Sequence, residues 1–501
     1  MKVEDTYLDQ AKPVLLAFFF SVFLTKIFQK PRTTVPHDAK EPPFISSHMP
    51  FIGHGIPFLQ DFSKLMQKLR SKHGPIFTIH IFGQRQHFIT SYTDIQKIWR
   101  HPNFDFKEFA YKAESHFSGM ESPQELKRTK IGAHTLAQYA HTMRGSQELE
   151  QLAIRFENAL KDAVNSHHVK TDEFVEVDLR QFCSTLIFHA AGKSLFGNVW
   201  LENVNVEKAI EQYTLFENDA PGIAGGLPQF LTRKGCRARD YLAKHVLLPI
   251  VKDGCENGGH TYIIEYLKQL KAAYKNDPNG DLKIASRLAG LLFAIMTNTM
   301  NTLFWAVAEV IESDEFLKSD LEQELQNVDE ANFTSYLECK KHMPLLNSII
   351  IETFRLHADP NSFRIAEQDC IVKNMTGGDY FFREGDMVFL LSTYDQLKVV
   401  KEDRDVFDGR RWLESTRDGN LNSKLLPIPS NQVLAPFGGG KHLCPGRFFA
   451  LLEMHLVISY CLKKYEFQKI DGQNIPSKAV ELSAPINAPK SDMKVLFRCK
   501  K

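Results

Sequence analysis

The sequence predicts a mainly α-helical protein with a minor β portion, built as one large domain behind a short apolar segment. Helical periodicity dominates from about residue 91 to 356, and short β-rich runs lie before and after this region. No linker, repeat or low-complexity stretch divides the 501-residue chain beyond about residue 45. Residues 46–501 are therefore expected to form a single domain whose strands come from both of its ends.

The composition is that of an ordinary globular protein, with 43% hydrophobic residues and a formal net charge of +1. A net charge so close to zero does not favour binding to the polyanionic backbone of nucleic acid, so no nucleic-acid partner is expected. The eight cysteines are scattered and form no CxxC pair, which favours a reducing compartment over a disulfide framework. The sequence also shows no clustered zinc ligands.

The run PVLLAFFFSVFLTKIF, residues 13–28, is short but dense enough in apolar side chains to span a membrane. Acidic residues precede this run and basic residues follow it, so the positive-inside rule places the rest of the chain in the cytosol. Residues 1–30 are therefore expected to form an uncleaved, single-pass signal anchor rather than a cleaved secretory signal. Prolines within residues 31–45 predict a stiff, extended hinge between the anchor and the domain.

Short strands are expected near both ends of the domain. Residues 75–90 contain two β-rich runs around Gly83–Gln84, which predicts a hairpin. Further short strands are expected between residues 363 and 436, and residues 479–499 are expected to form a last hairpin.

The segment APFGGGKHLCPGRFF, residues 435–449, sets one cysteine between a glycine-rich loop and an apolar run that predicts a helix. A cysteine before a helix is usually a buried, small apolar residue. Cys444 is also well placed to ligate haem iron, because a thiolate suits iron and a helix start points its positive end at the sulfur. Pro445 fits a first helical turn. Glycines leave room for a flat macrocycle at positions 438, 439, 440 and 446.

The spacing Phe437–x–x–Gly440–x–x–x–Cys444–x–Gly446 resembles the haem-binding signature of the cytochrome P450 family. This resemblance implies the cytochrome P450 fold, haem b as cofactor and an axial iron ligand at Cys444. It covers nearly the whole chain from about residue 45.

The resemblance also implies cationic partners for the haem propionates. Arg364 in SFRIAEQDC and His442, two residues before the cysteine, match positions that bind propionates in relatives. The basic run LKRTKIGAH lies where the family places further propionate and reductase contacts. The choice among Lys127, Arg128 and Lys130 stays open, and a solvated basic face is the alternative reading for all three.

A second motif is the pair Glu352 and Arg355 in IETFRLHA, which share one face of a predicted helix. In the family such a pair bonds a second arginine and braces the core beneath the haem-binding loop. Arg411, beside a tryptophan in FDGRRWLE, is the expected third member, with Arg410 in reserve. The alternative is an exposed pair worth a few tenths of a kcal/mol.

A third motif lies in the apolar helix predicted over residues 288–311. In the family an acid and an alcohol in mid-helix organise a water that supplies protons during oxygen activation. Asn298 stands in place of the acid and Thr299 retains the alcohol. Asn301–Thr302 is a second Asn–Thr pair one turn later, so the register stays open, and a polar kink is the alternative reading.

The pattern NTxxxxFW, ending at Trp305, resembles the branch of sterol 7α-hydroxylase and prostacyclin synthase. Residues 219–247 resemble that branch's loop over the substrate entrance. Its apolar residues are expected to be exposed and to dip into lipid, namely Ile223, Leu227, Phe230 and Leu231. Pocket residues are expected within 294–299, 359–362 and 484–486.

Together these resemblances imply a haem-thiolate mono-oxygenase anchored in the endoplasmic reticulum membrane. It would take electrons from NADPH through cytochrome P450 reductase and insert one atom of O₂ into a lipophilic substrate. A sterol, a terpenoid or a lipid-derived polycycle is the expected substrate class. Two alternatives remain: an isomerase or dehydratase that rearranges a peroxide without O₂ or reductase, and a non-catalytic haem sensor.

Overall fold

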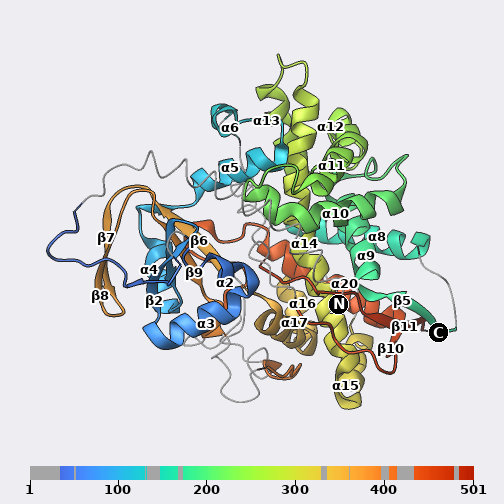
Figure 1. Ribbon diagram of the computed structural model, residues 1–501. Helices are drawn as coiled ribbons and strands as arrows, with labels where there is room; N and C mark the ends of the chain where they lie inside the picture. The colour runs from blue at the N-terminus through green and yellow to red at the C-terminus, as the bar shows by residue number, and fades with distance from the viewer. Residues whose placement is uncertain are drawn as a thin grey trace, which may run out of the picture. The chain divides into compact units, whose positions relative to one another are not determined.

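The computed structural model describes residues 34–49, 52–129, 131, 147–167, 173–328, 336–359, 361–396, 405–413, 434–478 and 485–500. These residues fall into two compact units (Figure 1). Unit 1 consists of the described residues within 1–108, 360–398 and 438–441, and unit 2 of those within 109–359, 399–437 and 442–501. The predicted anchor and Lys130 lie outside the described residues.

Unit 1 contains a six-stranded sheet in the order β1-β2-β3-β9-β6-β4 and a separate two-stranded sheet, β7-β8. The first sheet consists of β1 (Phe44–Ile45), β2 (Ile76–Ile81), β3 (Gln84–Ile89), β9 (Met387–Leu391), β6 (Asn361–Ala366) and β4 (Phe104–Asp105). The second consists of β7 (Cys370–Met375) and β8 (Gly378–Phe382). The helices of this unit are α2 (Gly55–Gln60), α3 (Phe62–His73), α4 (Tyr92–Arg100) and α18 (Thr393–Gln396).

The predicted hairpin is confirmed, since β2 and β3 pair antiparallel with Ile76 opposite Ile89. Its turn lies at Phe82–Gly83, one residue earlier than predicted, because both residues adopt positive φ (48° and 79°). Helix α3 packs the apolar face formed by Phe62, Leu65, Met66 and Leu69 against this sheet.

The end of the predicted hinge is bonded into unit 1. Lys40 exchanges backbone hydrogen bonds with β8, and β1 pairs in parallel with β2. Residues 40–45 therefore belong to the sheets of the unit, and an extended lead to an anchor would have to lie before them.

Unit 2 is mainly helical, and α14 (Gly280–Glu312) runs through the middle of its helices (Figure 1). The segments before α14 are α5 (Lys107–Ser118, which spans the boundary between the units), α6 (Pro123–Thr129), α8 (Gln147–His167), α9 (Leu179–Phe196), α10 (Val206–Ala224), α11 (Arg233–Leu242), the π-helix η1 (Ala243–Leu247), α12 (Leu248–Asp253) and α13 (Thr261–Ala273). Those after it are α15 (Glu315–Gln326), α16 (Tyr336–His342), α17 (Pro344–His357) and α20 (Arg447–Lys464).

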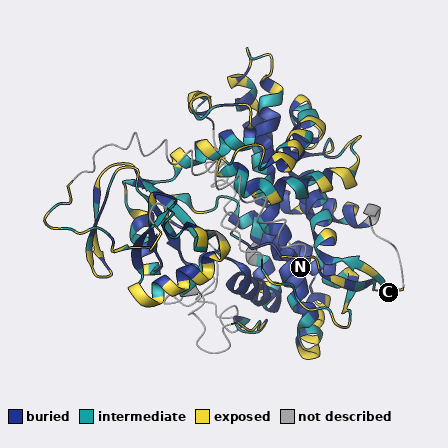
Figure 2. Ribbon diagram, viewed as in Figure 1, coloured by how far each residue is buried: buried dark blue, intermediate teal, exposed yellow. Residues whose placement is uncertain are grey.

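Helix α14 is buried along most of its length (Figure 2). Among the described residues it is the one helix long and apolar enough to cross a bilayer, but 72% of its apolar stretch is buried inside the protein. A helix that is apolar on nearly every side is suited to a core position. It packs against α9, α17 and α20. Its polar residues within 297–302 therefore lie next to α20, the helix that follows Cys444.

The described C-terminal strand finds its partners far away in the sequence. Strand β11 (Lys494–Cys499) pairs antiparallel with β10 (Tyr465–Lys469) and with β5 (Val175–Asp178). The strand expected immediately before it is not found among residues 485–493, so the predicted last hairpin is wrong for the described part of that segment.

Candidate active site

The cysteine loop folds so that backbone donors converge on the sulfur. The Cys444 amide donates to the Phe437 carbonyl over 2.9 Å, which closes the loop ahead of α20. Burial, the largest cause, raises the pKa of the Cys444 thiol, while hydrogen bonds from the backbone N–H groups of Gly446 and Arg447 and the Arg447 charge lower it. A half-buried thiol at a helix start, with N–H donors aimed at it, fits an axial thiolate of haem iron.

The four glycines of the loop play two different roles. A Cβ at Gly439 would lie 2.2 Å from the Trp99 ring, and one at Gly440 would lie 2.4 Å from the Trp99 carbonyl oxygen. Gly440 also has φ of +67°, which side-chain-bearing residues rarely adopt. At Gly438 and Gly446 an added Cβ would meet nothing within 4 Å. The inner two glycines are therefore needed for packing in unit 1, whereas room for a macrocycle at the outer two stays a prediction.

Arg364 on β6 carries a buried positive charge. Its side chain is 4% exposed and donates to the carbonyls of Phe363 (2.8 Å) and Gly439 (3.3 Å). Burial lowers its pKa to about 10, and the charge of Asp105 raises it only in part. Among the described residues its Nε has no hydrogen-bond partner. A buried guanidinium with an unused N–H fits a carboxylate ligand, as the haem propionate is.

The other expected propionate ligands, His442, Lys127 and Arg128, are less buried than Arg364. His442 ends the short 3₁₀ helix η5 (Gly440–His442) and is partly buried. Lys127 and Arg128 are both exposed in the last turn of α6. Their contacts with a propionate therefore stay predictions.

The polar residues within 297–302 of α14 make four different kinds of hydrogen bond. Thr297 bonds the Tyr213 hydroxyl (2.8 Å), and Thr302 donates to the Asn298 carbonyl of its own helix (2.8 Å). The side chains of Asn298 and Asn301 bond the backbone N–H and C=O of Ile486, at 3.2 and 3.4 Å. Thr299 alone among these residues contacts a carboxyl group, since its Oγ1 lies 3.3 Å from Oε2 of Glu453 on α20.

Glu453 is a residue that sequence reasoning missed. It is 1% exposed in the middle of α20, and burial raises the pKa of its carboxyl to about 8, against a lowering by the Thr299 hydrogen bond. A lone glutamate within the apolar run ALLEMHLV was the signal that could have pointed to it.

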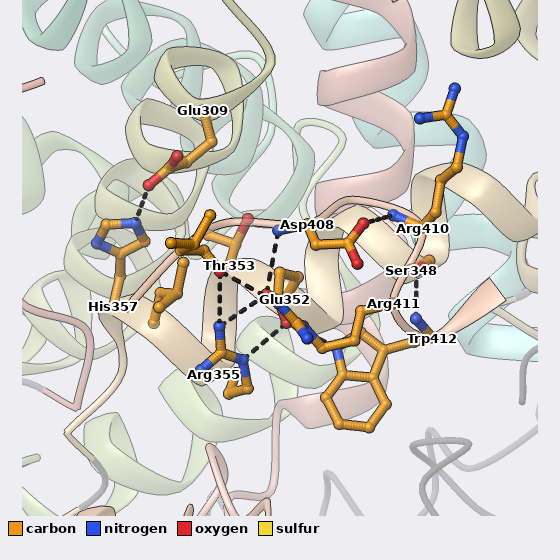
Figure 3. A network of polar contacts seen from close by, with 12 residues as sticks. Glu309, Ser348, Glu352, Thr353, Arg355, His357, Asp408, Arg410, Arg411 and Trp412 are labelled. Carbon is orange, nitrogen blue, oxygen red and sulfur yellow. Dashed lines mark hydrogen bonds and ion pairs between the residues drawn. The ribbon is translucent and has the colours of Figure 1, made fainter. Parts of the chain in front are cut away.

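The structure brings Glu352, Arg355 and Arg411 together in a buried cluster (Figure 3). Arg355 donates to both carboxylate oxygens of Glu352 over 2.8 and 2.7 Å. Arg411 Nε and the Trp412 indole N–H each donate to the same carboxylate over 2.9 Å. Arg410, the reserve candidate, instead pairs with Asp320 at the surface. The cluster leaves Glu352, at 0% exposed, fully paired.

The substrate-side segments show one clear departure from the sequence expectation. Ala294 is exposed, and its neighbours Phe293 and Ile295 on α14 are half-buried, so its place in a pocket stays a prediction. Of the four apolar residues named in the predicted lip, Phe230 is exposed at 59%, Ile223 is buried at 3%, and Leu227 and Leu231 are partly buried. Ile223 belongs to the inner face of α10, so the expectation of four exposed apolar residues is wrong. Residue 484 lies outside the described residues.

Comparisons with known proteins identify the family of this chain. A model of the cytochrome P450 family matches residues 42–495. The 7-alpha-hydroxycholest-4-en-3-one 12-alpha-hydroxylase of Oryctolagus cuniculus is 24% identical over 486 residues, 92% of this chain and 94% of that protein. The cholesterol 7-alpha-monooxygenase of Cricetulus griseus is 25% identical over 466 residues, 87% and 88% of the two chains.

A solved structure, retinoic acid bound cyanobacterial CYP120A1, superposes with a TM-score of 0.65 at 20% identity. The alignment covers 92% of this chain and all of that one, so the two share a fold. With the family match, it shows that the chain belongs to the cytochrome P450 family of haem-thiolate oxidoreductases.

Proposed function

We propose that this chain hydroxylates a sterol, using O₂ and electrons that reach it from NADPH through cytochrome P450 reductase. The observation that carries the proposal is the likeness to sterol hydroxylases over nearly the whole length of both chains. A second support is the geometry of α14, in which one buried alcohol is bonded to one buried acid. An oxygen-activating enzyme needs such a proton source inside a dry site.

The residues of this chain would hold and serve the cofactor in separate ways. Cys444 would ligate the iron, while the N–H groups of Gly446 and Arg447 orient and stabilise its sulfur. Arg364 would bind a propionate through its unused Nε–H. When bound, the haem supplies oxygen activation, and the thiolate increases its electron density. Thr299 Oγ1 would hold a proton where α14 meets α20.

Binding and cofactor dependence test this proposal together. The probes are cholesterol, 7α-hydroxycholest-4-en-3-one and 5β-cholestane-3α,7α-diol, added to the haem-loaded protein and followed by difference spectroscopy. At least one sterol should shift the haem spectrum and then form a hydroxylated product only with NADPH and reductase. Product formed from a lipid peroxide without NADPH would instead establish the isomerase alternative. Haem binding without any turnover would favour the sensor.

The ligand assignment has its own test. The reduced, carbon-monoxide-bound protein should show the long-wavelength band of thiolate ligation, and Cys444→Ala should abolish it. Cys461→Ala is the matched control, because Cys461 is a buried cysteine of α20 further from the loop. A histidine-type spectrum in the unmodified protein would contradict the assignment.

We also propose that residues 1–30 anchor the enzyme in the endoplasmic reticulum membrane with its body in the cytosol. Deleting them should release much of the protein from membranes in a flotation assay. Phe230→Ser in the shortened protein should release more, because this side chain is exposed and apolar. If the shortened protein stays fully bound and Phe230→Ser changes nothing, another surface must hold the membrane.

A further inference from the structure

One surface pocket lies within unit 1 and includes none of the residues proposed to hold the haem. It has a volume of about 500 Å³ and lies between α4 (Tyr92–Arg100) and β7 (Cys370–Met375), which pack together (Figure 1). A pocket of this size can hold a small ligand. Three of its lining residues are basic, Lys97, Arg100 and Lys373, and none is acidic. This pocket, called the α4 pocket below, therefore favours an anion.

Helix α4 presents a polar face to the α4 pocket. Thr93, Gln96, Lys97 and Arg100 line the pocket at positions i, i+3, i+4 and i+7, so they share one side of the helix. The apolar residues of the helix are buried in unit 1 instead. The hydroxyl and the amide add hydrogen-bond donors to the basic groups, which suits an anion with several acceptor oxygens, such as a phosphate group.

Two of the three basic residues are not neutralised inside the protein. Lys97 Nζ lies 3.2 Å from Oδ1 of Asp94, whose side chain is fully buried. By contrast, neither Arg100 nor Lys373 has a side-chain hydrogen bond or ion pair within the described part of the chain, and both residues are exposed. A guanidinium without a partner can bind a phosphate group through two parallel N–H bonds, and an ammonium adds a second positive charge.

His101 joins the two walls of the α4 pocket rather than adding charge. Its ring bonds the backbone of Ile371, and its Nδ1 accepts from the Asn103 N–H over 3.3 Å. Burial lowers the pKa of His101, and the bond to Ile371 raises it only in part, so the ring is neutral at pH 7. The charge available to an anion therefore comes from Arg100 on one wall and Lys373 on the other.

The strand register places the α4 pocket close to the end of the predicted hinge. Val372, which lines the pocket, pairs with Tyr380 of β8, and Tyr380 forms a parallel bridge with Lys40. Two strand spacings, roughly 10 Å, therefore separate Val372 from Lys40. With residues 1–30 in the membrane, as proposed above, the intervening residues 31–39 reach at most roughly 30–35 Å. This short tether keeps the pocket near the bilayer, whose cytoplasmic face carries anionic headgroups.

We propose that the α4 pocket binds the phosphate headgroup of an anionic membrane lipid, with Arg100 and Lys373 as its charged ligands. This role goes beyond sterol hydroxylation and depends only on the membrane location proposed above. The bound headgroup would hold unit 1 at the membrane surface by a contact separate from the anchor.

Hydrogen exchange followed by mass spectrometry tests the site in the full-length, haem-loaded protein on nanodiscs. The discs contain phosphatidylcholine alone or with phosphatidic acid, whose headgroup is a bare phosphate monoester. Peptides covering residues 92–102 and 370–376 should exchange more slowly in discs with phosphatidic acid. The phosphatidic acid content that gives half of this protection should rise about fivefold in Arg100→Gln and about fivefold in Lys373→Gln, because each removes one basic residue from a charged surface.

Two variants serve as matched controls. Lys68→Gln removes an exposed lysine of α3 in the same unit, which does not line the pocket, and should keep the protection. Lys373→Arg retains the positive charge and should also keep it. An equal loss in Lys68→Gln would mean a general attraction of basic residues to the surface and would overturn the site. Equal exchange with and without phosphatidic acid would overturn it as well.

Two further additions identify the source of the anion. Glycerol 3-phosphate, added to phosphatidylcholine discs, offers the same phosphate group from water. Protection by this compound but not by phosphatidic acid would show a site for a soluble phosphate ester and would overturn the lipid assignment. Protection that requires cytochrome P450 reductase, whichever lipid is present, would show a protein-docking surface and would overturn it too. Sterol turnover enters none of these readouts, so their failure would leave the proposed hydroxylase function standing.

Discussion

Glu352 and Glu453 are both buried carboxyl groups of unit 2, at 0% and 1% exposed, but their surroundings are opposite in kind. Glu352 accepts hydrogen bonds from two guanidinium groups, an indole and the Asp408 backbone amide. Glu453 has one hydroxyl as its partner among the described residues. A buried charge that is fully paired fixes a structure, whereas an acid buried against a neutral group keeps its proton and can give it up. The comparison assigns a stabilising role to the first carboxyl and a protonated state at neutral pH to the second.

The largest expected effect comes from removing the paired carboxylate. Glu352→Ala should lower the free energy of unfolding by roughly 3–5 kcal/mol and give little haem-loaded protein, because the buried Arg355 and the half-buried Arg411 lose their partner. Haem content per chain and chemical unfolding measure this. Normal haem content with normal stability would show that the cluster does not brace the core.

Glu453→Gln should instead raise the free energy of unfolding at high pH. The unfolded carboxyl titrates near its ordinary value while the folded pKa is about 8, so between these values the folded state keeps a proton that the unfolded chain has lost. Stability of the unmodified protein should therefore fall as the pH rises across this window. Above pH about 8 the variant should be more stable by on the order of 5 kcal/mol, and below the ordinary carboxyl pKa the two should be equal. Urea unfolding across this pH range checks it; equal stability at every pH would mean that Glu453 is not held protonated.

The two adjacent arginines provide a smaller, matched contrast. Arg411 Nε bonds the buried Glu352, whereas Arg410 pairs with Asp320, whose side chain is 58% exposed. Arg411→Ala should cost about 1–3 kcal/mol, because a buried carboxylate loses a charged donor. Arg410→Ala should cost less than about 0.5 kcal/mol, since surface pairs contribute little. Thermal unfolding of the two variants ranks them, and a larger loss for Arg410→Ala would reassign the third member of the cluster.

Much of this site follows from contiguous sequence. The cysteine loop, the Glu352–Arg355 pair and Thr299 each lie in a short motif whose spacing predicts a local geometry. Arg411 is likewise marked by its neighbour Trp412, which bonds the same carboxylate. The hairpin β2–β3 could be predicted for the same reason, because its register depends on a turn two residues long.

What could not be predicted depends on contacts between distant segments. Glu453 meets Thr299 across 154 positions of sequence, so neither residue marks the other. Strand β11 pairs with β5, more than 300 positions earlier, where a local hairpin was expected. Gly439 and Gly440 owe their lack of a side chain to Trp99, which no spacing within the loop reveals. Long-range packing decides these pairings, and a local pattern can mark an unusual residue but does not identify its partner.

The central claim is that Thr299, bonded to Glu453, is the proton-delivering alcohol of a mono-oxygenase. The most direct measurement is product formed per NADPH oxidised, compared between Thr299→Ala and Thr302→Ala. Thr299→Ala should lower this ratio by roughly one to two orders of magnitude with peroxide released. Thr302→Ala should stay near the unmodified enzyme, because the Thr302 hydroxyl bonds the Asn298 carbonyl of its own helix, whereas Thr299 also contacts the carboxyl group of Glu453. Uncoupling by Thr302→Ala with full coupling in Thr299→Ala would contradict the claim.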